Sequence, residues 1–326
     1  MNRTNKQNPL VSGVVAGAMV GAALAGFNHL AEMAADAPTP VIGGDQRYYA
    51  WRLGRVFYHV GGAEDAPPMV LIHSLHAAAS GYEWRYTFDF FVEKGYRVYV
   101  PDLLGFGLSD RPAMVYDDEV YIALIGDFLR DVVQAPAVVM ATSVSAAFAI
   151  ASAARHPEWV AKLVLIVPVG VSQRNSQVPG LTSTLNGIFS ARVVGEALFN
   201  LLTMPGNIRN FLKQDGFHRA DLITDEMIEH HYNLAHLPNA HYAPAAFISG
   251  LTNRDIGQEW ASLKIPLLLV WGYHGKTTPP TKGTEFLKLN PRAATNGYDA
   301  KLLPQYECAE SFNADTLAWL EGRRKE

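Results

Sequence analysis

The sequence predicts an α/β protein in which helices flank a mostly parallel central sheet and a mainly helical segment is inserted into it. Two observations support this prediction. Short apolar runs alternate with helical patterns from Arg47 onward, and such runs are typical of strands buried on both faces of a sheet. The alternation then stops between Gly170 and Ile265, where no run is as apolar as those on either side.

The expected strands are short apolar runs bounded by turn signals or polar residues. They span residues 55–62, 67–74, 96–103, 136–141, 161–169 and 265–272. Two helices are indicated between them, because Trp84, Phe88 and Phe91 recur at helical spacing and a second apolar face runs from Tyr121 to Leu129. In such sheets the chemistry collects at the carboxyl ends of the strands, so the residues that follow each run are the candidates for a site.

The stretch between Gly170 and Ile265 is too long to be a structureless connection. Its helical pattern is rich in Asn, His and aromatic residues, and we interpret it as a helical lid. The predicted organisation is a hydrophobic N-terminal segment at 1–36, a Pro/Gly-rich linker at 37–46, the first part of the core at 47–170, the lid at 171–264 and the second part of the core at 265–326.

Composition excludes several classes of protein. The 326 residues include 27 Lys and Arg against 31 Asp and Glu, for a formal net charge of −4. A nucleic-acid-binding protein would carry a basic stripe, so we expect no nucleic-acid partner. Cys308 is the one cysteine, which excludes an internal disulfide and a CxxC zinc site. We expect neither a cofactor nor a metal ion.

The N-terminus differs from the rest of the chain. Residues 10–27 contain no charge and follow Arg3 and Lys6, and Gly13, Gly17 and Gly21 recur every four residues. Three interpretations stay open: a membrane anchor, a signal peptide cut near residues 35–37, and a helix docked on the protein's own surface. The first two predict a membrane-associated or exported protein with membrane contact through residues 10–27, and the third a cytoplasmic one. A retained anchor would leave its basic end in the cytoplasm.

The stretch "VVMATSVSAAFAI", residues 138–150, indicates a strand that turns sharply into a helix. Such a turn can present a serine at its apex, provided that the residues two before and two after are small. For Ser143 these are Ala141 and Ser145, in place of the usual glycines. Ser145 could itself be the apex, but Ser143 follows the strand directly. Alternatively, these serines are only small residues at a tight packing point.

Two further segments favour a catalytic role for Ser143 over a packing role. "LIHSLHAAAS" (residues 71–80) follows one expected strand, and "DLLGFGLSDRP" (residues 102–112) follows the next. With the Ser143 turn and "LLLVWG" at 267–272, they resemble the α/β-hydrolase family. The resemblance covers roughly residues 47–322 and is most specific at D-x-x-G-x-G-x-S-D-x-P. It implies an α/β-hydrolase fold with a helical lid. Some relatives use an aspartate nucleophile for halides or epoxides, and Ser143 argues against that chemistry.

The resemblance also implies roles for individual residues. Ser143 stands at the nucleophile position, and the backbone N–H groups of Val144 and Leu75 stand where the oxyanion hole forms. The two partners of the serine are replaced. Gly275 stands where the family's W-G-x-x-D aspartate would be, and Gln305 stands five residues before Glu310, where the family has its histidine.

No histidine follows His274, so the usual Ser–Asp–His order cannot be completed. His76, in the oxyanion-hole loop, is a speculative base and could equally line the pocket passively. The lid histidines are treated as surface or packing residues; they are His218, His230, His231, His236 and His241. His73 is expected to hold its loop, and Asp102 and Asp110 to fix the loop that contains them.

Two functions follow. In the first, the protein is a serine hydrolase of ester or lipid-like substrates, a class suggested by apolar stretches at 187–206 and 242–251. In the second, it is a catalytically impaired relative that binds an apolar ligand or a partner. The residues favour the second, because removing triad members leaves only about 10³–10⁴-fold acceleration over water. Family membership favours the first.

Overall fold

The computed structural model describes residues 9–171 and 179–323. Its centre is an eight-stranded sheet in the order β1-β2-β4-β3-β5-β6-β7-β8. The six strands from β4 to β8 in that order are parallel, whereas β2 pairs antiparallel with both β1 and β4. The strands are β1 Asp45–Trp51, β2 Gly54–Gly61, β3 Pro68–Ile72, β4 Arg97–Pro101, β5 Ala137–Thr142, β6 Val160–Ile166, β7 Leu267–Gly272 and β8 Ala294–Tyr298.

All the apolar runs expected to be strands form strands, from β2 to β7. The sequence did not indicate β1 and β8, which lie at the two edges of the sheet. Most residues of β1 are exposed, and β8 is only partly buried. An edge strand has one neighbour and need not be apolar, so it leaves no apolar run to detect.

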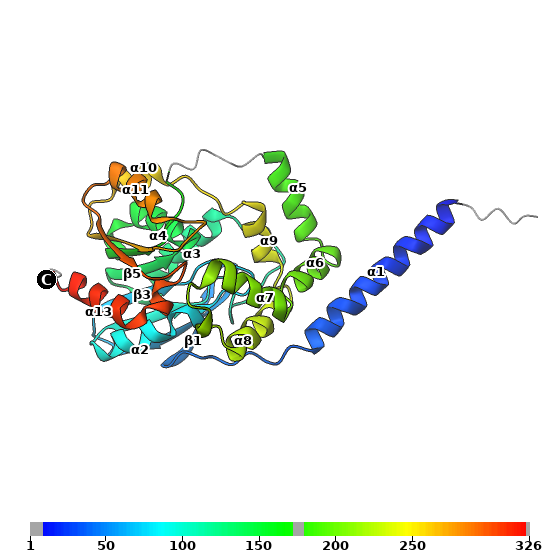
Figure 1. Cartoon of the computed structure of the whole chain (residues 1–326), viewed down its shortest axis with the longest axis horizontal. Coiled ribbons are helices and arrows are strands. Elements are labelled where there is room, and N and C mark those ends of the chain that lie inside the picture. Colours follow the sequence, from blue (N-terminus) through cyan, green and yellow to red (C-terminus); the bar gives the residue numbers. More distant parts are fainter. Residues whose placement is uncertain (1–8, 172–178, 324–326) are drawn as a thin grey trace, which may run out of the picture.

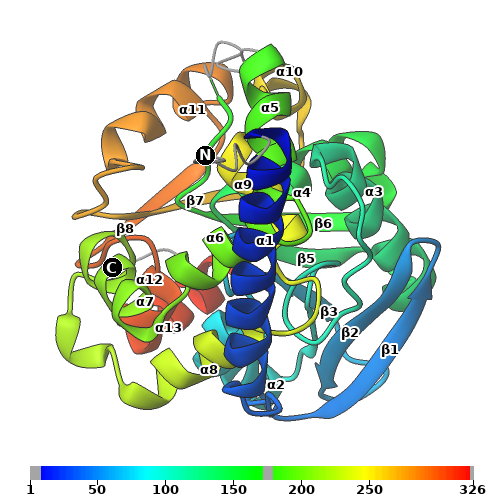
Figure 2. The same cartoon turned by 90° about the vertical axis from the view of Figure 1, so that its right-hand side faces the viewer.

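Helices cover both faces of the sheet (Figure 2). On one face α3 (Asp118–Phe128) packs on α4 (Val144–Arg155), with α10 (Gly257–Ser262) and α11 (Gly283–Leu289) beyond them. On the other face α2 (Arg85–Glu93) packs against α13 (Ala309–Leu320), which follows the short helix α12 (Pro304–Glu307). This arrangement confirms the predicted α/β fold class.

The central strand β5 explains where the candidate site lies. All six of its residues are buried between β3 and β6. The helix that follows, α4, is rich in alanine and buried from Val144 to Ala153. Alanine favours the helix and its small side chain allows close packing, so α4 can approach the sheet and α3 closely. The turn between β5 and α4 therefore lies at the middle of the sheet's carboxyl edge.

Between β6 and β7 the described residues form helices, and we call residues 179–262 the helical insertion (Figure 1). Besides α10, its α-helices are α5 Pro179–Phe189, α6 Val194–Leu202, α7 Pro205–Phe211, α8 Asp225–Ala235 and α9 Tyr242–Ser249. Helices are what the sequence predicts here. The exact division of the chain into domains stays a prediction, although β1 already begins at Asp45, within the predicted linker.

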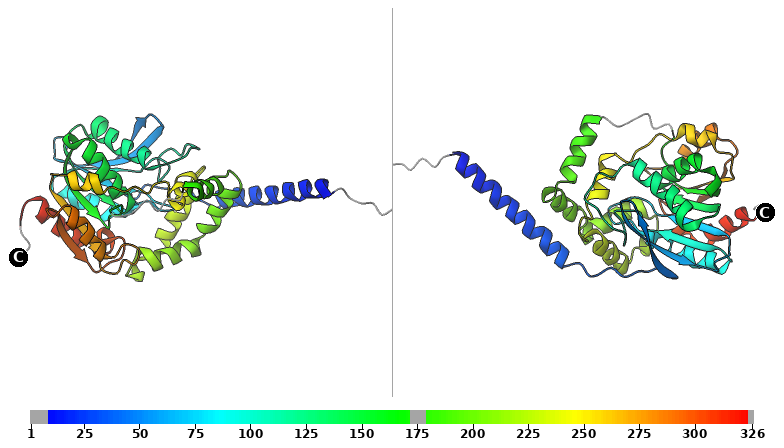
Figure 3. Two further views of the ribbon diagram at one scale, coloured as in Figure 1. Left: turned by 90° about the horizontal axis from the view of Figure 1, so that it is seen from above. Right: turned by 180° about the vertical axis from the view of Figure 1, so that it is seen from behind.

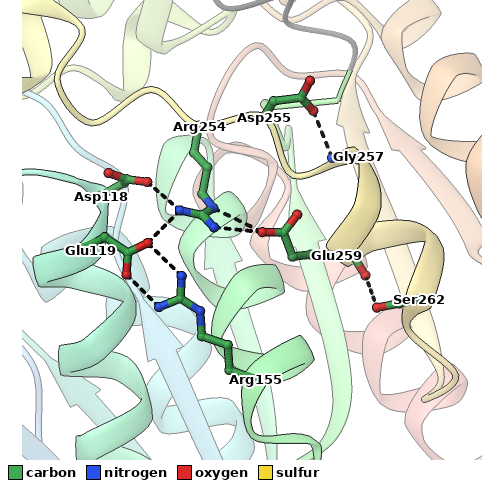
Figure 4. A network of polar contacts seen from close by, with 8 residues as sticks. All are labelled: Asp118, Glu119, Arg155, Arg254, Asp255, Gly257, Glu259 and Ser262. Atoms are coloured by element: carbon green, nitrogen blue, oxygen red, sulfur yellow. Dashed lines mark hydrogen bonds and ion pairs between the residues drawn. The ribbon is translucent and has the colours of Figure 1, made fainter.

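An ion-pair network holds the end of the insertion to the core (Figure 4). Arg254, just before α10, pairs with Asp118 and Glu119 at the start of α3, each at 2.8 Å, and with Glu259 of α10 at 2.9 Å. Arg155 at the end of α4 shares Glu119. Networks of this kind stabilise more than isolated exposed pairs, so the network fixes where the chain re-enters the sheet domain.

The N-terminal segment forms the helix α1 (Pro9–Met33), which projects from the body of the protein (Figures 1 and 3). Its C-terminal end is held by hydrogen bonds to the helical insertion. Asn28 donates to Val193 O and Glu196 Oε2, both at 3.1 Å, and the Tyr232 hydroxyl donates to Ala31 O at 3.3 Å. None of the helices in the described part of the chain is long and apolar enough to cross a membrane.

Candidate active site

Ser143 occupies the turn between β5 and α4. Its backbone has φ 59° and ψ −125°, a left-handed conformation that non-glycine residues rarely adopt. Its N–H donates to Ile166 O of β6 at 2.8 Å, which ties the turn to the neighbouring strand. Strain of this kind persists where the surrounding structure enforces it and is common at catalytic centres. The side chain is partly exposed at the carboxyl edge of the sheet.

Ser145, the alternative apex, lies inside α4 and is fully buried. Ala141, two residues before Ser143, is fully buried as well. The neighbours at both positions are thus enclosed by protein, which explains why only small residues fit there. Of the two serines, only Ser143 has the geometry of an exposed apex.

The two predicted oxyanion-hole amides are available. Leu75 follows β3 and Val144 is the first residue of α4, and both side chains are buried. Neither N–H donates a hydrogen bond to a residue that the structure describes. Amides at a helix N-terminus have no intrahelical acceptor, and a developing oxyanion could supply one. The role of the two amides stays a prediction.

Contacts within the loop after β4 explain why its sequence motif contains an aspartate and a glycine. The Asp102 carboxylate accepts from Gly81 N and Leu108 N, both at 2.7 Å. Gly107 has φ 52°, and a Cβ there would lie 2.0 Å from Asp102 Oδ2. Glycine is therefore required at this position both by the backbone and by the aspartate. Burial raises the pKa of Asp102 to about 6, against the lowering by the Gly81 and Leu108 N–H groups.

Asp110 and His73 fix the conformation of their loops, as the sequence predicts. Asp110 accepts from the Arg55 backbone N–H at 2.8 Å and pairs with the Arg55 guanidinium, which joins the loop to β2. His73 is completely buried. Its Nε2 accepts the Leu103 N–H at 2.9 Å, and its Nδ1–H donates to Ser74 O at 2.7 Å. Because both ring nitrogens are used, His73 has no free nitrogen for catalysis.

Gln305, at the histidine position of the family, points into the base of the elbow. It is completely buried in α12, and its Nε2 lies 3.3 Å from both Thr142 Oγ1 and Glu83 Oε1. Thr142 immediately precedes Ser143. The chain thus brings residue 305 next to the elbow as the resemblance implies, but with an amide that cannot accept a proton near neutral pH. Gln305 Oε1 has no hydrogen-bond partner among the described residues.

Gly275, at the aspartate position, lies in the turn after β7 and is buried. A Cβ at this position would lie 3.0 Å from the carbonyl oxygen of Thr278, so a larger side chain requires the turn to adjust. No carboxylate is present at this position.

The sequence interpretation missed Glu83, a carboxylate beside Gln305. It lies in the short helix η1 (Gly81–Trp84) and is almost completely buried. Ser74 donates to its Oε2 through its hydroxyl at 2.6 Å and its N–H at 3.1 Å. Burial raises the pKa of Glu83 to about 7 in spite of these bonds. An unusual pKa beside a catalytic position marks a functional candidate. No local motif points to Glu83, since its partner lies 222 residues away.

His76 belongs to a group of aromatic rings between the oxyanion-hole loop and the insertion. It stacks on His231, with ring centroids 5.5 Å apart, and His230 stacks on Tyr82 at 4.5 Å. His76 Nδ1 accepts the Ala78 N–H at 3.3 Å, which places the ring proton on Nε2 in the neutral form. Burial and the nearby His231 hold the pKa of His76 well below its usual value. The proposed base is therefore neutral but weak.

His231 should make the protein sensitive to acid. Burial lowers the pKa of His231 to about 4, whereas the unfolded chain has a value of about 6.5. The unfolded state therefore binds more protons between these values, so the stabilising contribution is complete above about pH 6.5 and is lost as the pH falls towards 4. We expect His231→Gln to remove on the order of 3 kcal/mol of this pH dependence, measured by urea unfolding at pH 7 and pH 4.5.

Comparing His231→Gln with the wild type separates the contribution of His231 to the pH dependence of stability from the contributions of other groups that titrate in this range. The lowered pKa values of His76 and His230 also make the fold less stable as the pH falls. The raised pKa values of Glu83 and Asp102 instead make it more stable as the pH falls. The exposed His156, replaced in the same way, serves as the control. Equal pH dependence in wild type and His231→Gln would contradict the prediction.

Two cavities in the described part of the chain lie elsewhere. One lies between residues 38–42, the η1 region and α8, and is lined by Asp102, Tyr82 and His230 among others. The other separates the end of α1 from α6 and is lined by Asn28, Glu196 and His236 among others. Neither is lined by Ser143. We place the candidate site at Ser143 nonetheless, because its strained backbone lies at the apex of the turn, directly before the first helical amide of α4.

A parallel sheet with a serine at a strained strand–helix turn defines a class of enzymes that act through a nucleophile elbow. Residues 67–299 match the family model described as alpha/beta hydrolase fold, and the chain belongs to this family.

Known relatives share most of the chain at low identity. The chain is 25% identical over 274 residues to a 2-hydroxy-6-oxononadienedioate/2-hydroxy-6-oxononatrienedioate hydrolase of Comamonas testosteroni, covering 80% of this chain and 90% of that protein. It is 24% identical over 273 residues to a non-heme chloroperoxidase of Streptomyces lividans, covering 82% and 96%.

Solved structures agree on the fold. A serine hydrolase involved in carbazole degradation has a TM-score of 0.69 at 21% identity, covering 86% of this chain and 100% of that one. A membrane phospholipase A has a TM-score of 0.70 at 20% identity and covers 96% of both chains. At these identities the similarity concerns the fold alone.

Proposed function

We propose that this chain is a serine hydrolase of ester or lipid-like substrates that works slowly because its histidine and aspartate are replaced. The observation that carries the proposal is the conformation of Ser143, whose φ of 59° is costly for a serine and keeps its side chain at the apex. Ser143 would attack the acyl carbon, and the Leu75 and Val144 N–H groups would stabilise the oxyanion. His76 would act as a weak base through Nδ1, after this atom stops accepting the hydrogen bond from the Ala78 N–H.

The absence of a strong base limits the rate. A serine hydroxyl is a poor nucleophile until a neighbouring group takes its proton. Gln305 cannot do so, and the depressed pKa of His76 makes it a reluctant acceptor. Acceleration by the oxyanion hole and by binding alone amounts to about 10³–10⁴-fold over water. The expected activity is therefore real but small, and it depends on Ser143.

The burial of Gln305 favours a second candidate function. Its Nε2 contacts both Thr142 and Glu83, so the amide fills the histidine position as part of a packed network. In this candidate function the chain binds an apolar ligand or a partner without turning it over. In this case Ser143 would be a retained structural feature of the turn.

Exposed apolar side chains support an apolar or lipid-like substrate. The exposed large apolar side chains of α5 and α6 are Leu181, Ile188, Val194, Leu198, Leu201 and Leu202, and those of the described part of α1 are Met19, Val20, Phe27, Leu30 and Met33. Apolar surface of this extent, continued by α1, is typical of protein or lipid contact. We propose that this side of the protein approaches a lipid surface, and co-sedimentation with phospholipid vesicles measures that contact directly.

Labelling with a fluorophosphonate probe separates the two functions. We expect slow labelling of the wild type and none of Ser143→Ala, together with a Ser143-dependent hydrolysis of p-nitrophenyl esters that is faster for longer acyl chains. Ser145→Ala is the matched control and should keep the labelling. If folded wild type shows neither labelling nor turnover above the Ser143→Ala level, the hydrolase proposal fails and the binding function stands.

A further inference from the structure

Two histidines and an aspartate from distant parts of the chain meet on the surface. His218 lies in the helical insertion, His274 follows β7, and Asp299 follows β8. One potential ligand atom from each of the three side chains lies within 4.8 Å of those of the other two. All three side chains are exposed. The three residues play no part in the candidate active site.

A simple hydrogen bond does not account for this group. His274 Nε2 lies 2.7 Å from Asp299 Oδ1, which is hydrogen-bond distance, but His218 Nε2 lies 4.0 Å from the same oxygen. The two imidazoles are stacked almost in parallel, with ring centroids 3.7 Å apart and an interplanar angle of 8°. The stack directs both Nε2 atoms to one carboxylate oxygen.

The backbone beneath the group is held in place. The buried Glu307 carboxylate accepts the N–H groups of His218 at 2.7 Å and of Lys301 at 2.8 Å. His274 N donates to Ala300 O at 3.0 Å. The segments that carry the three side chains are thus fixed relative to one another, which lowers the cost of organising a site.

Two nearby positively charged side chains already interact with other groups. The Arg219 guanidinium pairs with Asp221 at 2.8 Å, and Lys301 Nζ donates to the carbonyl oxygens of Lys213 and Gln214. The charge of Arg219 is balanced by Asp221, whereas Lys301 keeps its charge and directs it at these two carbonyl oxygens.

We propose that His218, His274 and Asp299 form a binding site for a divalent first-row transition-metal ion, with Zn²⁺ as the representative. Two imidazoles and a carboxylate suit Zn²⁺, Co²⁺ or Ni²⁺ better than Mg²⁺ or Ca²⁺, which prefer oxygen ligands alone. Zinc–ligand bonds of about 2.0–2.1 Å place ligand atoms about 3–3.4 Å apart. The distances of 2.7 and 4.0 Å lie on either side of this range. Because each imidazole lone pair lies in the plane of its ring, binding requires the two exposed rings to turn out of their parallel stack. Water completes the coordination.

A bound ion would join two parts of the fold. His218 belongs to the insertion, whereas His274 and Asp299 follow neighbouring strands at the sheet edge. His274 directly precedes Gly275 at the former aspartate position. The ion would therefore hold the insertion to the sheet beside the candidate active site. This role does not depend on whether Ser143 is catalytic.

Calorimetry with Zn²⁺ on the full chain, after removal of metals with a chelator, tests the proposal. We expect one ion per chain with a dissociation constant in the micromolar range and an increase in the thermal midpoint with Zn²⁺ concentration. Since loss of an outer-shell partner already costs about 10–100-fold in affinity, His218→Ala, His274→Ala and Asp299→Ala should each weaken binding by at least about 100-fold. The exposed His156→Ala is the matched control and should bind as the wild type does.

Co²⁺ gives a second measurement, because its visible absorption reports the coordination of the ion itself. Circular dichroism verifies that each variant is folded. If folded wild type binds no Zn²⁺ at 100-fold excess, or if the three variants bind as tightly as wild type, the proposed site is wrong. None of these measurements uses hydrolysis, so failure of the metal site and failure of the proposed hydrolase activity are distinguishable.

Discussion

Replacing Gln305 with histidine is expected to raise Ser143-dependent ester hydrolysis by about 10²- to 10⁴-fold, the usual contribution of a positioned general base. Gln305 Nε2 already lies 3.3 Å from Thr142 Oγ1, beside the elbow, and 3.3 Å from Glu83 Oε1. An imidazole at 305 would therefore have a carboxylate to orient it, as the third member of a triad does. Turnover of p-nitrophenyl acetate measures the gain.

Glu83 is a better partner for this histidine than an aspartate restored at position 275. A Cβ at 275 would meet the Thr278 carbonyl oxygen at 3.0 Å, whereas Glu83 is already in place. In the Gln305→His background, Glu83→Gln should remove most of the gain and Ser143→Ala all of it. Gln305→Asn is the control for altered packing and should show no gain. A folded Gln305→His protein with wild-type turnover would contradict the prediction.

Replacing Ser143 with glycine should abolish fluorophosphonate labelling and at the same time stabilise the fold by about 1 kcal/mol. A non-glycine residue in such a sparsely populated conformation costs about 1–3 kcal/mol, which glycine avoids. Glycine gives back about 0.5–1 kcal/mol through the entropy of the unfolded chain, so the net gain is modest. Urea unfolding at pH 7 measures this change in the free energy of unfolding.

Ser145→Gly is the matched control two residues away. Ser145 lies inside α4, where glycine is a poor helix former, so this substitution should destabilise the protein by up to about 1 kcal/mol. Opposite signs for the two serine-to-glycine changes are the expected result. If both destabilise equally, the turn at Ser143 stores no strain, and the strongest support for the hydrolase proposal is lost.

The central strands and the elbow could be predicted because they are local. In β5, six consecutive residues are buried on both faces, and this produces an apolar run in the sequence that ends at Ser143. The loop after β4 could be predicted for a similar reason. Gly107 and Asp102 are five residues apart and constrain each other directly, so the motif is visible within one short segment. The edge strands β1 and β8 could not, because their exposed faces need no apolar residues.

By itself the sequence determined the fold class and the serine at the elbow, and it predicts that Gln305 and Gly275 replace the family's histidine and aspartate. Only the tertiary structure decided what surrounds these positions. It brings Glu83 to Gln305 across 222 residues, and it brings His218 of the insertion to His274 and Asp299 at the sheet edge. The physical reason is that a buried strand or a tight turn leaves its requirements in adjacent residues, whereas contacts between distant side chains depend on how the helices and strands pack.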